Sequence, residues 1–177
     1  MDGPFWHDTR LPFVVSDAPA ITLTTSYQAL VPTSYLPVLG ANYFNYTGKA
    51  LRIRMFGRFT TGATPGSFTL GYLWGNNANN TGTSIAANSV NMTANLTGYS
   101  WQADLTIRAR SLGTGGTIIA TGIWYLQNVG FLMMPVTLPG SIALDLTPNN
   151  LVSPQMQRSG STTETVQVHD ILFESIN

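Results

Sequence analysis

Cysteine is absent from this chain of 177 residues, and histidine occurs only twice. Without thiols the chain cannot form disulfides or cysteine-based zinc sites, and it cannot use a cysteine nucleophile. The two histidines, His7 and His169, are far apart in sequence, so a metal site would need ligands collected from across the fold. We therefore expect no metal and no cofactor.

Charged side chains are also scarce. Asp, Glu, Lys and Arg make up 9% of the chain, against roughly 25% in ordinary soluble domains, while 44% of the residues are hydrophobic. This composition excludes a disordered chain, because disorder needs low hydrophobicity and high charge. A formal net charge of zero gives little electrostatic protection against self-association. The composition thus favours a homo-oligomer or another obligate member of an assembly.

The sequence has no run of about 18 apolar residues, so it predicts no membrane span. Its first residues, MDGPFWHDTRLPFVV, carry acidic side chains and an early proline where a secretory signal has a basic stretch and an apolar run. We expect no association with a membrane.

Apolar and polar residues alternate along 50–60 and 101–110. Such a period of two predicts strands with one buried face, because successive side chains of a strand point to opposite sides. β-Branched and aromatic residues between turn residues predict further strands at 67–74, 117–126, 141–146 and 165–176. No capped helical stretch is present, and we interpret 84–94 as a short strand or a loop. The fold class predicted is an all-β antiparallel sandwich, with Trp74, Trp101 and Trp124 in its core.

The last predicted strand contains a change of register. Val166 and Val168 share one face, but Ile171 and Phe173 are out of step with them. A β-bulge near His169 and Asp170 would return these later residues to the core.

The first 48 residues differ from the rest, with proline at five positions and only short alternating pieces. We expect an extended N-terminal arm and edge strands over 1–48 and the sandwich over 49–177, within a single domain. Phe5, Trp6 and Phe13 lie in the expected arm, where no core pattern includes them. They are candidates for burial against another subunit.

Catalytic motifs are missing. No G-x-S-x-G nucleophile elbow occurs, and Gly113, Gly115 and Gly116 lack the lysine and helix of a phosphate loop, so we interpret them as a hairpin turn. No motif supports the carboxylate pairs that could serve as acid and base, which are Asp104 with Asp145 and Asp170 with Glu174. We expect that the chain is not an enzyme.

Arginines occupy the polar faces of two predicted strands. Arg52, Arg54 and Arg58 share one face, and Arg108 and Arg110 share another, so neighbouring strands would create a basic stripe. Zero net charge and the lack of interleaved aromatic residues argue against nucleic-acid binding. We expect these five arginines to form ion pairs across a subunit boundary, because a guanidinium tolerates desolvation and matches a carboxylate.

Five segments, ALRIRMFGRFTT, GSFTLGYLWG, WQADLTIRARSLGTGGTIIATGIW, SIALDLTP and TVQVHDILFES, carry a family likeness. From about residue 50 onward the chain resembles tailed-bacteriophage virion proteins with a jelly-roll fold related to tumour-necrosis-factor-like trimers. The likeness is one of strand order and style. It implies a jelly-roll sandwich, a trimer, and a role as a capsid decoration, minor capsid or tail-associated protein without catalytic residues.

The sequence therefore leads to a non-enzymatic virion protein, a trimeric head decoration or minor capsid protein that stabilises the capsid from outside. Its partners would be the major capsid protein or other virion proteins. One alternative is a tail- or fibre-associated module that recognises host carbohydrate, although the loop at 75–82 contains no aromatic residue. Another is a glycosidase or cupin-like enzyme, for which the histidines are too few.

Overall fold

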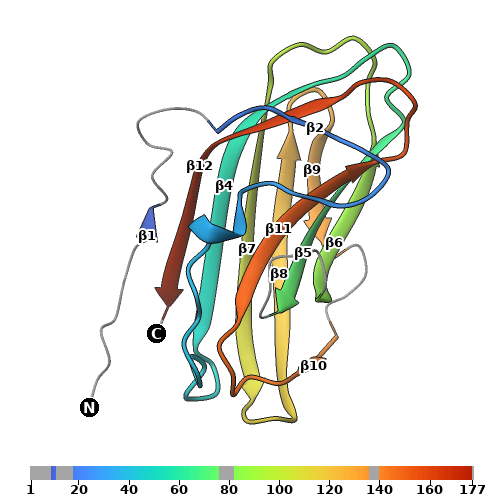
Figure 1. Ribbon diagram of the computed structural model, residues 1–177. Coiled ribbons are helices and arrows are strands. Elements are labelled where there is room, and N and C mark those ends of the chain that lie inside the picture. The colour runs from blue at the N-terminus through green and yellow to red at the C-terminus, as the bar shows by residue number, and fades with distance from the viewer. Residues whose placement is uncertain (1–8, 11–17, 76–81, 136–139, 177) are drawn as a thin grey trace.

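The computed structural model describes residues 9–10, 18–75, 82–135 and 140–176. Within these ranges the chain is all-β, without an α-helix, and its one helical turn is the 3-10 turn η2, Thr33–Tyr35. The described residues include no helix with the length and apolar character of a membrane span. Two antiparallel sheets face each other (Figure 1), which confirms the expected sandwich.

The larger sheet, sheet A, has the strand order β1-β12-β4-β7-β8-β10, with β2 also paired to β12 and β9 to β8. Its strands are β1 (Thr9–Arg10), β2 (Ile21–Thr22), β4 (Ala50–Thr60), β7 (Tyr99–Ser111), β8 (Gly116–Leu126), β9 (Gly130–Met134), β10 (Ile142–Leu144) and β12 (Thr165–Ile176). Sheet B has the order β3-β11-β5-β6. Its strands are β3 (Gln28–Ala29), β5 (Ser67–Gly75), β6 (Thr83–Asn91) and β11 (Leu151–Arg158).

The strand pairs are those of a chain folded back on itself and then rolled up. β2 pairs with β12, β3 with β11, β4 with β7, and β5 with β6, and successive pairs alternate between sheet A and sheet B. This arrangement is a jelly roll. β8, β9 and β10 are inserted between β7 and β11, and they widen sheet A. The segment at 84–94, interpreted as a short strand or a loop, contributes most of β6.

Residues 18–48 supply the first two strands of the roll. β2 lies at the edge of sheet A and β3 at the edge of sheet B. The buried side chains of Leu23, Leu30 and Val31 belong to the same core as those of the later strands. This part of the chain therefore contributes to the stability of the sandwich itself.

The predicted bulge in β12 is confirmed. The register of β12 against β4 shifts between Val168 and Asp170. Val168, Ile171 and Phe173 are consequently all buried, while Asp170 stands opposite Phe56 on the outer face of sheet A.

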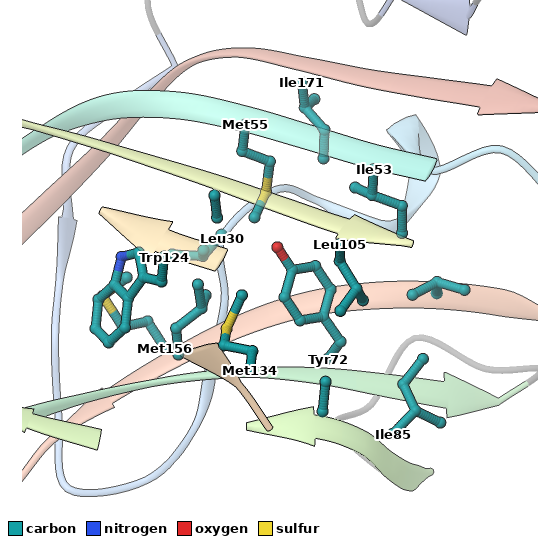
Figure 2. Close-up of a cluster of buried hydrophobic side chains, with 14 of the residues drawn as sticks. Leu30, Ile53, Met55, Tyr72, Ile85, Leu105, Trp124, Met134, Met156 and Ile171 are labelled. Carbon is teal, nitrogen blue, oxygen red and sulfur yellow. The ribbon is translucent and has the colours of Figure 1, made fainter. Parts of the chain in front are cut away.

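Large aromatic side chains fill the space between the sheets. Trp74, Trp101 and Trp124, predicted to be core residues, are at most 5% exposed. Tyr72 is completely buried, and burial raises the pKa of its hydroxyl. Figure 2 shows its ring beside Leu105 and Met134 in this core. The Tyr72 hydroxyl has no hydrogen-bond partner among the described residues.

Replacing Tyr72 by phenylalanine should leave stability unchanged or raise the free energy of unfolding by about 1 kcal/mol, because an unpartnered buried hydroxyl is unfavourable. Urea denaturation followed by circular dichroism would measure the change. Tyr72→Leu, which removes ring contacts as well, is the control and should be destabilised by about 2 kcal/mol or more. A loss above about 1 kcal/mol in Tyr72→Phe would mean that the hydroxyl has a stabilising partner.

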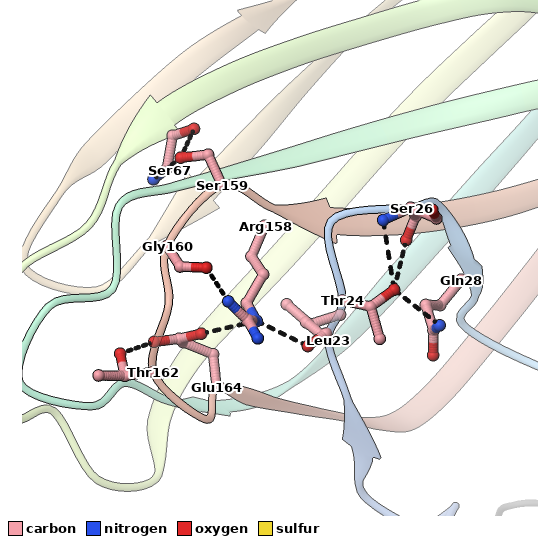
Figure 3. A network of polar contacts seen from close by, with 10 residues as sticks. All are labelled: Leu23, Thr24, Ser26, Gln28, Ser67, Arg158, Ser159, Gly160, Thr162 and Glu164. Atoms are coloured by element: carbon pink, nitrogen blue, oxygen red, sulfur yellow. Dashed lines mark hydrogen bonds and ion pairs between the residues drawn. The ribbon is translucent and has the colours of Figure 1, made fainter.

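A buried ion pair joins the end of β11 to the chain before β12 (Figure 3). The Arg158 Nε lies 2.9 Å from Oε2 of the fully buried Glu164, and it donates a hydrogen bond of 2.7 Å to the Leu23 carbonyl. Arg158 also donates to the Gly160 carbonyl, and the Thr162 hydroxyl donates to Glu164. This clasp connects residues 159–164 to the segment between β2 and β3.

Candidate functional site

The outer face of sheet A, which points away from sheet B, carries many of the charged side chains and two exposed aromatic rings, those of Phe56 and Phe131. Strand register aligns them in rows across β12, β4, β7, β8 and β9. The rows are Glu174-Arg52-Thr106-Thr121, Leu172-Arg54-Asp104-Ile123-Met133 and Asp170-Phe56-Gln102-Tyr125-Phe131. Residues from five strands thus form one continuous surface.

Two arginines of β4 are paired within the chain. The Arg52 Nε donates to both carboxylate oxygens of Asp104, at 2.9 and 3.0 Å, and the Arg54 Nη2 donates to Glu174 at 2.8 Å. Hydrogen bonding to Asp104 raises the pKa of Arg52, and the charges of Asp104 and Glu174 add to this effect. Arg52 and Arg54 thus have carboxylate partners within one copy, and the expectation of ion pairs across a subunit boundary stays a prediction for them. Their partners stand on the neighbouring strands β7 and β12.

The other three arginines differ from one another. The Arg108 Nη1 donates a hydrogen bond of 2.7 Å to the Gly48 carbonyl. Arg58 and Arg110 make no hydrogen bond or ion pair within the described part of the chain. β4 and β7 are neighbours, as a basic stripe requires, but Asp104 and Glu174 neutralise its middle.

Two open hollows flank Phe56 on this face. The first, which we name the Asp170 hollow, has a volume of about 420 Å³ and is lined by Arg54, Phe56, Gln102, Asp104, Ile123 and Asp170, among others. The second, the Arg58 hollow, has a volume of about 570 Å³, and its lining includes Phe56, Arg58, Ser100, Gln102, Tyr125 and His169. The hollows are adjacent, because Phe56 and Gln102 line both.

Apolar side chains surround the hollows. Phe131 is 69% exposed, Met133 65%, Phe56 51% and Ile123 38%. The Phe56 ring is stacked on His169 with ring centroids 6.4 Å apart, and the ring centroids of Tyr125 and Phe131 are 4.7 Å apart. No sequence motif identifies these residues as a group. The one feature of the sequence that points to an apolar patch here is Phe56, an aromatic residue on the otherwise polar face of the strand at 50–60.

The carboxylates considered for catalysis do not form working pairs. Asp145 follows β10, whereas Asp104 lies midway along β7. Hydrogen bonds from the Thr147 hydroxyl and from the Thr147 backbone amide lower the pKa of Asp145. Roughly 13 Å of strand separates the backbone positions of Asp170 and Glu174, and the Glu174 carboxylate is paired with Arg54. The described residues contain no group of three His, Asp or Glu side chains suited to a metal ion.

Two other predictions concern the glycines between β7 and β8 and the aromatic residues near the N-terminus. Gly113 and Gly116 form the predicted hairpin turn between β7 and β8, where the Gly116 amide donates to the Gly113 carbonyl at 3.0 Å. The interface candidates Phe5, Trp6 and Phe13 lie outside the described residues.

Comparisons with known proteins place the chain near no established family. No protein-family model matches it, and no curated protein sequence matches it. Among solved structures, a Lotus tetragonolobus seed lectin aligns over 98% of this chain and 90% of its own length, at 10% identity and a TM-score of 0.38.

Two further structures resemble the chain at a similar level. Alginate lyase Aly36B in complex with an alginate tetrasaccharide aligns over 98% of this chain and 99% of its own length, at 9% identity and a TM-score of 0.34. A botulinum neurotoxin type C structure, described as interacting with two ganglioside molecules, aligns over 90% of this chain and 44% of its own length, at 12% identity and a TM-score of 0.31. At these values the matches assign neither a family nor a function, and the jelly-roll fold rests on the strand order.

Proposed function

We propose that this chain is a non-enzymatic structural subunit of a virion, which assembles as a homo-oligomer through the outer face of sheet A. The favoured form is a trimer that decorates the capsid exterior and stabilises it in contact with the major capsid protein or other virion proteins. The sequence resemblance of residues 50 onward to phage virion proteins supports the virion setting.

The observation that carries the proposal is the exposure of Phe56, Ile123, Phe131 and Met133 on one sheet face. Contiguous apolar surface of this kind is typical of protein contacts, because water leaves it when a partner binds. The arginines in the middle of the face already have carboxylate partners within the chain. A second copy can therefore cover the face without meeting a strong field of one sign.

The oligomer can be tested with the double variant Phe131→Ser, Met133→Ser. We expect wild-type protein to sediment as a multiple of 19.1 kDa, with a trimer favoured, and the double variant to associate at least about tenfold more weakly. Sedimentation velocity over a concentration series measures both. Val38→Ser, at a residue 57% exposed outside the sheets, is the control and should associate like wild type.

Two results would contradict this proposal. One is a wild-type protein that remains a monomer of 19.1 kDa at every concentration. The other is a double variant that keeps its fold and associates as strongly as wild type.

A second function, recognition of an acidic carbohydrate, is favoured by the two hollows. Their volumes lie in the range of small-molecule sites, and the Arg58 hollow combines the rings of Phe56 and Tyr125 with the cation of Arg58. In this alternative the aromatic residues that would contact the sugar lie on strands. From the sequence, a carbohydrate-binding module was expected to carry them in loops such as 75–82. A saccharide would leave Phe131 and Met133 exposed, so we favour self-association.

A further inference from the structure

We propose that copies of this chain meet through an ion pair between Arg58 of one copy and Asp170 of the next. The inference rests on the proposed self-association and adds the polar contact that sets the orientation of the copies. It concerns two side chains that no interaction within the described chain accounts for.

Once the internal ion pairs are counted, the centre of the outer face keeps one charge of each sign. Arg52 and Arg54 have carboxylate partners, whereas Arg58 has none among the described residues. Asp170 keeps a buried oxygen, Oδ1, without a hydrogen-bond partner. The chain itself covers Oδ1, so another copy would meet the part of Asp170 that lines the open hollow, where a cation would offset the charge that the isolated chain leaves unpaired.

The Phe56 side chain separates these two charges within one copy. Arg58 lines one hollow and Asp170 the other, and Phe56 lines both. On the Arg58 side, the Phe56 ring is stacked on His169 with an interplanar angle of 16°. In strand register, Arg58 stands opposite Gln167, and Asp170 stands opposite Phe56. The structure contains no ion pair between Arg58 and Asp170.

Opposite charges on the same face make that face complementary to a copy of itself. In a closed symmetric assembly, Arg58 of each copy can face Asp170 of a neighbour, and every copy then makes both contacts. The protein's net charge of zero adds no general repulsion between copies. A free anion would satisfy Arg58 alone and would leave the Asp170 carboxylate unpaired, so a second copy of the chain is the occupant that fits both residues.

A charge-exchange experiment tests this contact. Arg58→Asp and Asp170→Arg are each expected to weaken self-association at least about tenfold, because each places like charges opposite one another. The double variant Arg58→Asp, Asp170→Arg restores opposite charges between copies and should return association to within about threefold of wild type. Sedimentation velocity measures association, and thermal melting confirms that each variant is folded.

Arg110→Asp is the matched control. Arg110 lies on β7, has no partner among the described residues, as Arg58 on β4 has none, and lines neither hollow. We expect the Arg110→Asp variant to associate like wild type. If wild type is oligomeric but the single variants keep full association, or the double variant is no better than the singles, the Arg58–Asp170 contact is rejected and the proposed function stands. A monomeric wild type rejects both. A monomer that binds polygalacturonate in calorimetry, with binding lost in Arg58→Asp, would assign the hollows to an acidic carbohydrate instead.

Discussion

Gly57→Ala is expected to lose about 3 kcal/mol or more of unfolding free energy. Gly57 lies on β4 between Trp101 of β7 and Val168 of β12. A Cβ atom there would sit 1.8 Å from the Gln167 carbonyl oxygen and 2.9 Å from Nε1 of Trp101. The indole donates its hydrogen bond of 3.3 Å to that same carbonyl. Any side chain at residue 57 would therefore push β12 away from β4 beside the bulge.

The matched control is Gly115→Ala in the β7–β8 hairpin, where a Cβ atom would meet nothing within 4 Å. Urea denaturation should give Gly115→Ala the stability of wild type within about 0.5 kcal/mol, while Gly57→Ala melts early or fails to accumulate as soluble protein. Gly122→Ala provides a second case, because its Cβ would lie 2.1 Å from the Asp104 carbonyl oxygen. A loss below about 1 kcal/mol in Gly57→Ala would show that β12 is not held as tightly to β4 as the register implies.

Glu164→Ala should be destabilised by about 3–5 kcal/mol, because it leaves the guanidinium of Arg158 without its counter-charge in a buried position. Glu164 is fully buried, and the Arg158 side chain is only 16% exposed. The expected loss is reduced to the extent that the Leu23 and Gly160 carbonyls still accept hydrogen bonds from Arg158. Chemical denaturation at neutral pH measures the change.

The exposed pair of Arg54 with Glu174 offers a matched control on the same protein. Glu174→Ala should cost less than about 1 kcal/mol, since exposed ion pairs contribute little to stability. Combining Arg158→Met with Glu164→Leu should cost less than the sum of the two single substitutions, because neither charge is then left unpaired. Equal, small losses for Glu164→Ala and Glu174→Ala would contradict a stabilising role for the buried clasp.

Much of sheet A could be predicted from the sequence, because its long strands each have one buried and one exposed face. In β4, Ile53 and Met55 are buried between Arg52, Arg54 and Phe56. The bulge in β12 was predictable for the same reason, since the apolar residues after His169 are out of step with those before it. A strand with one buried and one exposed face alternates between apolar and polar residues, and this alternation identifies the strand in the sequence.

Sheet B and the added strands were harder to predict. β11 is buried on both faces and contains Pro154, which usually argues against a strand. The Pro154 carbonyl accepts a hydrogen bond from Leu30, so this residue directs its backbone groups toward β3 and not toward β5. Its missing amide therefore costs β11 no bond to β5, with which it pairs along its whole length. β9 was missed because GFLMM has no alternation.

The candidate surface illustrates a second limit. The polar face of β4 could be predicted, but the partners of Arg52 and Arg54 depend on which strands lie beside it. Asp104 and Glu174 are 52 and 120 residues away from these arginines in sequence. Only the folded topology places them next to β4. For the same reason, composition alone could not show that the exposed apolar residues share one face.

The distance between spin labels on neighbouring copies tests the self-association face most directly. Because the chain has no native cysteine, Thr121→Cys on the outer face of β8 and Ser89→Cys on the outer face of β6 each provide a single labelling position. Sheets in a sandwich pack about 10 Å apart, so copies that meet through sheet A should place the Ser89 labels farther apart than the Thr121 labels by roughly 20 Å. We predict this order in pulsed dipolar spectroscopy. Closer labels at Ser89 than at Thr121, or no dipolar coupling at either position, would contradict assembly through the outer face of sheet A.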